Sequence, residues 1–300
     1  SAPRTPREYF SQEEDEERSP VADMSPNLWI AAAVAVFAWW FSTGAILAVV
    51  KRADAGGRKS HLWAVLLGLP VLVLGAGLFV DTLSRTEPGA VYAAFFSALM
   101  IWGWIEMAFL CGVITGPNRG ATPPGVPEWE RFVRAWGAIA HHELLLFGTL
   151  VVMGALAAGA ANPFAFYTFA LLFAARVSAK LNLFYGVPRI NVEFLPDAIA
   201  HLPTHFRVRR FTAMFPVSIA GLGWAVWTCL AALGAAAAPH EALGWALVGA
   251  IAALALLEHV LMVVPLPDAK LWRWMLPEPR DAATGPAPGP ARPDAVEPAE

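Results

Sequence analysis

The sequence predicts an all-α fold, a polytopic membrane helix bundle with about seven transmembrane helices. Of 300 residues, 57% are hydrophobic and only 15% are charged, against roughly 25% charged in an ordinary soluble domain. Mean hydropathy is +0.51. A water-soluble globule of this length could not bury so much apolar surface. Seven apolar runs are each long enough for a spanning helix, which takes about 20 residues.

Turn-forming or charged residues separate these runs. Pro88-Gly89 precedes the third run, and Asn162-Pro163 separates the fourth from the fifth. Backbone polar groups in lipid must be satisfied within their own segment, and no alternating strand pattern is present, so each run is expected to be a helix. The seven expected spans are residues 27–50, 62–80, 90–114, 138–160, 163–185, 213–236 and 243–264.

The composition also predicts three regions along the chain. Residues 1–26 carry a net charge of −4 and few apolar residues, which predicts a disordered acidic extension. Residues 27–275 form the membrane domain. Residues 276–300 are rich in proline and acidic, which predicts a disordered tail. The two cysteines, Cys111 and Cys229, lie in apolar runs, which excludes a disulfide framework and a thiolate metal cluster.

The distribution of Lys and Arg predicts the orientation. The segments after the first, third, fifth and seventh spans carry 13 basic residues, whereas the opposite loops contain only Arg85. By the positive-inside rule the C-terminus faces the cytoplasm and the N-terminus lies outside. This predicts a multi-pass membrane protein. The basic residues are ordinary inward-loop charges, and nothing indicates nucleic-acid binding.

Ionisable residues of the spans fall at one depth. At about 1.5 Å per helical residue, those of spans three, four, five and seven lie on the order of 7–14 Å below the cytoplasmic boundary. A charge in the membrane interior costs about 2.5–3.5 kcal/mol on insertion scales, so it usually has a partner and often a function. The predicted slab comprises Glu106, His141, His142, Glu143, Arg176, Lys180, Asn182, Glu258 and His259.

Three interpretations of this slab remain open. In the first, the carboxylates pair with Arg176 and Lys180 and lock helices together. In the second, a non-haem metal ion is bound. In the third, a histidine is the axial ligand of a tetrapyrrole pigment. The candidate metal ligands are Glu106, His142, Glu143, Glu258 and His259, and the candidate pigment ligands are His142 and His259.

The longest inward loop, residues 186–212, is a second candidate site, because loops longer than about 12–15 residues often carry function. Its candidate docking residues are Asn191, Glu193, His201 and His205. Pro203 lies between the two histidines, so a regular helix that presents both is not expected. The basic and aromatic segment 206–211 is expected to lie on anionic lipid headgroups.

An ordered set of motifs is similar to the PuhE family of photosynthetic complex assembly proteins, over roughly residues 27–275. The motifs are WIEMAFL at 104–110, TGP at 115–117, HE at 142–143, SAKLNLFYGV at 178–187, NVEFLP at 191–196, LEH at 257–259 and VPLPD at 264–268. The resemblance implies an integral protein of the bacterial inner (intracytoplasmic) membrane. Such a factor helps assemble the reaction centre and core antenna and influences bacteriochlorophyll supply. It transfers no catalytic residue.

Two classes of function therefore follow. In the first, the protein is an assembly factor whose partners are membrane lipid and reaction-centre or core antenna subunits or other assembly factors, with bacteriochlorophyll as the candidate cofactor. In the second, it is a membrane enzyme in which Glu and His bind a non-haem metal ion to act on a pigment or quinone-like lipid.

Overall fold

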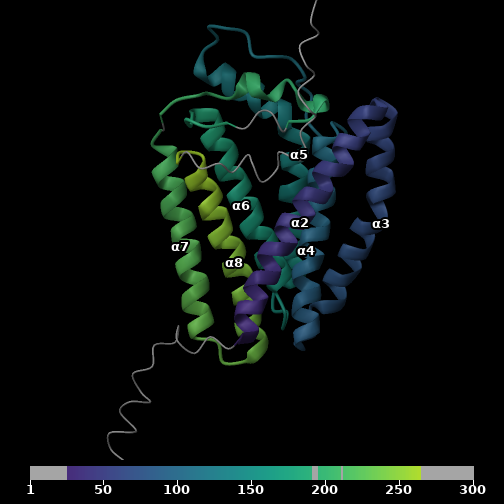
Figure 1. Cartoon of the computed structure of the whole chain (residues 1–300), viewed down its shortest axis with the longest axis vertical. Helices are drawn as coiled ribbons and strands as arrows, with labels where there is room; N and C mark the ends of the chain where they lie inside the picture. Colours follow the sequence, from purple (N-terminus) through teal and green to yellow (C-terminus); the bar gives the residue numbers. More distant parts are fainter. Residues whose placement is uncertain (1–25, 191–194, 211, 265–300) are drawn as a thin grey trace, which may run out of the picture.

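The computed structural model describes residues 26–190, 195–210 and 212–264. This part of the chain forms a bundle of seven long helices (Figure 1). All seven are long and apolar enough to cross a membrane, which confirms the predicted fold class. The helices are α2 (Pro26–Gly56), α3 (Arg58–Thr82), α4 (Pro88–Leu110), α5 (Glu128–Ala157), α6 (Phe164–Tyr185), α7 (Met214–Gly234) and α8 (Pro239–Leu261).

The connection between α6 and α7 contains two short 3-10 helices, η2 (Asp197–Ile199) and η3 (Leu202–His205). An isolated bridge between Val187 and Val208 is the sole β-type pairing within the described ranges. Apart from Pro26, the predicted terminal segments 1–26 and 276–300 lie outside the described residues, as does the end of the predicted membrane domain, 265–275.

One helix is clearly longer than its apolar run. α5 begins at Glu128 rather than near residue 138. Its first turns carry Glu130 and Arg134, which form an i,i+4 ion pair of 2.7 Å. Such pairs stabilise a helix in water, so α5 extends beyond the apolar segment that the bilayer requires.

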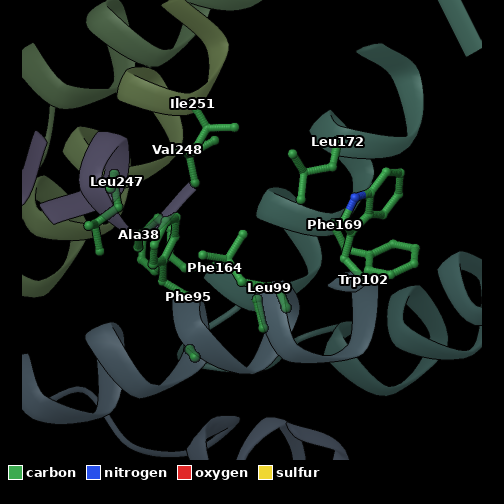
Figure 2. Packing of buried hydrophobic residues seen from close by; sticks show 14 of the residues in the cluster. Ala38, Phe95, Leu99, Trp102, Phe164, Phe169, Leu172, Leu247, Val248 and Ile251 are labelled. Atoms are coloured by element: carbon green, nitrogen blue, oxygen red, sulfur yellow. The ribbon is translucent and has the colours of Figure 1, made fainter. Parts of the chain in front are cut away.

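The core lies along α4 and α8. In the most apolar 18-residue stretch of α4, 67% of the residues are buried inside the protein. The corresponding share is 50% in α8 and 17–28% in the other five helices. Figure 2 shows Phe95 and Leu99 of α4 beside Leu247 and Ile251 of α8. α2 packs on α8, and α6 packs on both α4 and α8, whereas α3, α5 and α7 are peripheral. The outer faces are apolar and exposed, as lipid contact requires.

The two ends of the bundle differ in their connections. One end carries the α2–α3 turn and the long connections 111–127 and 186–213; it is uppermost in Figure 1 and is called the basic end here. The described basic residues of the predicted inward loops lie there. At the opposite end the connections are short, and buried Asn162 joins two of them: its backbone N donates to Leu83 O and its Nδ2 to Arg85 O, both at 3.0 Å.

Gly244 of α8 allows the closest side-chain approach of α6. A Cβ at this position would lie 2.3 Å from ring carbons of buried Phe164. Because forcing extra volume into a packed core costs about 1–3 kcal/mol, we expect Gly244→Ala to lower the free energy of unfolding by that amount. Thermal or denaturant unfolding in detergent measures this. The control is Gly221→Ala on α7, where nothing lies within 4 Å of the added Cβ; equal stability of the two variants would contradict the packing described.

Candidate functional site

Glu106 of α4 is paired across the bundle with α6. Its side chain is buried, and Oε2 accepts a hydrogen bond of 2.8 Å from Nη2 of Arg176. The other carboxylate oxygen, Oε1, lies 3.6 Å from Nε2 of His142 on α5. The apolar sequence around Glu106 makes α4 a spanning helix, and the ion pair neutralises the carboxylate that this helix carries into the membrane.

A second ion pair lies beside the first. Lys180, one helical turn beyond Arg176, donates to Oε1 of Glu143 on α5. His142 is fully buried between the two pairs: Nδ1 lies 3.2 Å from Glu143 Oε1 and 3.3 Å from Lys180 Nζ. Its ring packs on Phe109, with ring centroids 4.3 Å apart. Two carboxylates thus balance two cations around an imidazole. Glu106, His142, Glu143, Arg176 and Lys180 are called the charge network below.

The connection after α4 sets the position of His142 and Glu143. Its Thr115 carbonyl accepts a hydrogen bond of 3.0 Å from the backbone N of His142, and Asn118 N donates to the Gly137 carbonyl, also at 3.0 Å. Gly116 lies so close to α5 that an added Cβ would be 2.1 Å from Gly137 O. Residues 115–118 therefore form backbone hydrogen bonds with α5 at the turns just before and at His142 and Glu143.

The two slab residues of α8 lie apart from the charge network. Glu258 accepts a hydrogen bond of 3.0 Å from the indole Nε1 of Trp39 on α2. His259 is buried, and its Nδ1 lies 2.8 Å from the Ala255 carbonyl, so Nδ1 is the donor. Nε2 then accepts from the Ser178 hydroxyl of α6 at 3.0 Å. Both ring nitrogens of His259 are thus engaged.

Two other slab residues take different positions. His141 is exposed on the outer face of α5. Asn182 is fully buried, and its Nδ2 donates to the Ser178 carbonyl at 2.9 Å and to the Ser218 hydroxyl of α7 at 2.7 Å. Asn182 therefore ties α6 to α7.

The predicted slab is thus divided into separate polar contacts. The described residues contain no group of three or more His, Cys, Asp or Glu side chains placed to hold a metal ion. The five candidate ligands do not converge, because Glu258 and His259 bond to α2 and α6 instead. The candidate pigment ligand His142 is enclosed by the charge network and Phe109. Two of the three carboxylates, Glu106 and Glu143, form ion pairs with Arg176 and Lys180 that join α4, α5 and α6, whereas Glu258 bonds to Trp39.

The α6–α7 connection is held by an arginine that the sequence shows only as one of the basic residues near the fourth span. Arg131 of α5 is buried; its Nη1 donates to His205 O at 2.9 Å, and its Nη2 donates to Phe184 O at 2.7 Å. Its guanidinium also lies 3.8 Å from the centroid of the Phe184 ring. Arg131 therefore fixes both the end of α6 and the end of η3.

The candidate docking residues of this connection are described in part. Asn191 and Glu193 lie outside the described residues. His205 is buried, with Nδ1 2.6 Å from the Thr122 hydroxyl. Burial, with His201 and Arg131 nearby, lowers the pKa of His205; burial and Arg119 lower the pKa of His201. Of the two histidines, His205 thus lies within the fold rather than on a docking surface.

Two cavities, each of about 300 Å³, flank Arg176. One lies among α2, α4, α6 and α8 and includes Glu106 and Glu258 in its walls. The other lies under the α6–α7 connection, between α5 and α6, and is lined by Lys180 and several aromatic rings. Trp39, which contributes to the first cavity, reads in the sequence as an ordinary aromatic of a spanning helix. The carboxylate of Glu258 within a spanning helix is a signal that some neighbouring helix supplies a partner, but it does not indicate which one.

Gly116 offers a test of how the charge network is positioned. We expect Gly116→Ala to push the 115–118 segment off α5, because the new Cβ would meet backbone atoms, and to cost about 1–3 kcal/mol or more. Hydrogen exchange of the amide of His142 measures the loss of its bond to Thr115. Gly120→Ala, whose Cβ would lie 3.5 Å from Asn118 Oδ1, is the control. Unchanged exchange in both variants would contradict the docking of this segment.

Comparison with known proteins identifies one similar protein and one matching family. A protein of Rhodobacter capsulatus, named "Uncharacterized 30.4 kDa protein in puhA 5'region", is 46% identical over 266 residues, which cover 88% of this chain and 97% of that protein. No solved structure matches the chain. The family model described as "Protein of unknown function (DUF3623)" matches residues 24–283. Because that match spans most of the sequence, the chain belongs to this family.

Proposed function

We propose that the protein is an integral membrane factor that helps assemble the photosynthetic reaction centre and its core antenna, and that it influences the supply or handover of bacteriochlorophyll. The observation that carries this proposal is the relative in Rhodobacter capsulatus, whose name places it in the puhA 5' region. That position suggests a photosynthesis-related membrane protein. The ordered motifs that resemble PuhE supply the finer role, assembly.

The charge network supports the role of a rigid membrane scaffold. Its carboxylates and cations are matched within the protein and join α4, α5 and α6. A helix bundle held from within can leave its outer surface apolar, and here that surface carries large exposed side chains. Examples are Trp29 and Phe41 on α2 and Trp224 and Trp227 on α7. Such faces suit contact with lipid and with the apolar helices of membrane subunits under assembly.

The proposal places the protein in the bacterial intracytoplasmic membrane with the basic end toward the cytoplasm. The asymmetry of the basic residues supports this orientation. In that arrangement the connection 111–127 and the described parts of the connection between α6 and α7 (186–190, 195–210 and 212–213) face the cytoplasm, where the protein would meet newly made membrane subunits and pigment. These connections are therefore the proposed meeting surface for other assembly factors.

Deletion of the gene and complementation by variants tests the proposed function. We expect the deletion to lower the near-infrared absorbance of reaction centre and core antenna per cell and to slow phototrophic growth. The wild-type gene and Glu87→Leu restore both, since Glu87 is exposed at the opposite end of the bundle and pairs with Arg85. Glu106→Leu leaves Arg176 without its carboxylate, and it fails to restore pigment-complex levels.

Matched amounts of each variant in the membrane, measured by immunoblot, are required for this comparison. Normal absorbance in the deletion strain would contradict the assembly role. Equal complementation by Glu106→Leu and Glu87→Leu would contradict the need for the charge network in that role. Affinity purification from phototrophically grown membranes, with pigment and metal analysis of the same sample, then identifies the partner.

A further inference from the structure

The cavity among α2, α4, α6 and α8 lies in the half of the bundle next to the basic end. Toward the opposite end the same helices pack closely through one apolar cluster that includes Ala38, Phe95 and Leu247 (Figure 2). Leu195 of the α6–α7 connection lines the cavity from the basic end. The cavity volume of about 300 Å³ is at the small end of the range of ligand-binding pockets.

The walls of this cavity combine a large apolar surface with a few polar groups. The apolar part includes Ile46, Leu47, Trp102, Leu172 and Leu254. The polar part consists of Trp39, Ser42, Thr43, Glu106, Arg176, Glu258 and His259. Mostly apolar walls with a small number of placed hydrogen-bonding groups are typical of sites for small molecules and cofactors.

Glu258 is the first group that the helix packing alone does not explain. It lies within the membrane-spanning part of α8 and is exposed on the helix surface. Glu258 accepts a hydrogen bond from Trp39 Nε1. Among the described residues it takes part in no salt bridge. An ionisable group in a spanning helix is costly, and such residues usually mark a partner or a ligand pathway. Its second oxygen is available to accept a hydrogen bond.

Arg176 is the second such group. Its guanidinium has five N–H donors, and Nη2 is used by Glu106. Its Nε is buried without a hydrogen-bond partner. Buried polar atoms are nearly always satisfied, so unpaired atoms beside a cavity call for an explanation. Arg176 thus has donor capacity left over beside the cavity wall.

We propose that this cavity binds one lipid-soluble ring compound of the quinone and quinol class. A ring carbonyl oxygen accepts a hydrogen bond from Arg176, and in the reduced form a ring hydroxyl donates to Glu258. Glu106 and Arg176 neutralise each other, and the remaining carboxylate, that of Glu258, disfavours an anionic ligand. A neutral ring with oxygen atoms that can accept or donate matches both groups, and the apolar walls take the remainder of the molecule. This binding does not depend on the proposed assembly role.

Binding of radiolabelled decylubiquinol, the reduced form whose ring hydroxyl can donate to Glu258, to the full chain in lipid nanodiscs under anaerobic conditions tests the proposal. Empty nanodiscs correct for partition into lipid. We expect saturable binding of one molecule per chain. Glu258→Leu should weaken it by about tenfold or more, because it removes the group that accepts the ring hydroxyl. Trp39→Phe should weaken it in the same direction, because it removes the donor that positions the Glu258 carboxylate. Glu87→Leu and Trp227→Phe, whose side chains are exposed elsewhere, should leave it unchanged.

Several results would overturn the proposal. These are the absence of saturable binding, saturable binding that all four variants leave unchanged, and displacement of the probe by a fatty acid but not by unlabelled quinone. Thermal unfolding midpoints establish that each variant is folded. If Glu258→Leu does not fold, Trp39→Phe decides the outcome, because it keeps an aromatic ring and removes the N–H. The same variants in the growth assay separate loss of quinone binding from loss of assembly.

Discussion

The need to neutralise charge inside the membrane governs the arrangement of α4, α5 and α6. Glu106 on α4 and Glu143 on α5 each meet a cation of α6, and His142 lies between the two pairs. Removing one partner of a buried ion pair typically costs about 3–5 kcal/mol, because the remaining charge is left unpaired. The three helices therefore have one relative register in which every charge of the network is matched.

This register extends to the basic end of the bundle. The 115–118 segment bonds to the turn of α5 that carries His142, and Arg131, on the same helix, holds the end of α6 and the end of η3. The α6–α7 connection is thereby packed over the cavity that Lys180 lines. A single helix, α5, thus links the buried charge network to the surface that we propose meets other assembly factors.

Much of this arrangement could be predicted from the sequence. Hydropathy gives seven spans because a bilayer demands about 20 apolar residues per helix. Depth along each helix places Glu106, Glu143, Arg176 and Lys180 in one slab, but it does not say which carboxylate pairs with which cation. Depth does not give direction around the helix axis, so the sequence could not separate Glu258 and His259 from the charge network, nor place His141 on the outer face.

The long-range contacts could not be predicted, and the reason is again geometric. Trp39 lies more than two hundred residues from Glu258, and nothing in a single apolar run indicates which helix will be its neighbour. The sequence predicts that Arg131 is an exposed charge of an inward loop. In the structure it is buried and donates hydrogen bonds to two backbone carbonyls. Gly116 shows its role only when α5 is placed beside it.

The most direct test of the central claim is a double-mutant cycle on the ion pair between Glu106 and Arg176, measured as unfolding free energy in detergent. Glu106→Gln, Arg176→Gln and the double variant would be compared with the wild type. A coupling energy of about 2–3 kcal/mol is expected for a buried pair that holds two helices together. Effects of the two single variants that add to within about 0.5 kcal/mol would show that the pair does not act as described.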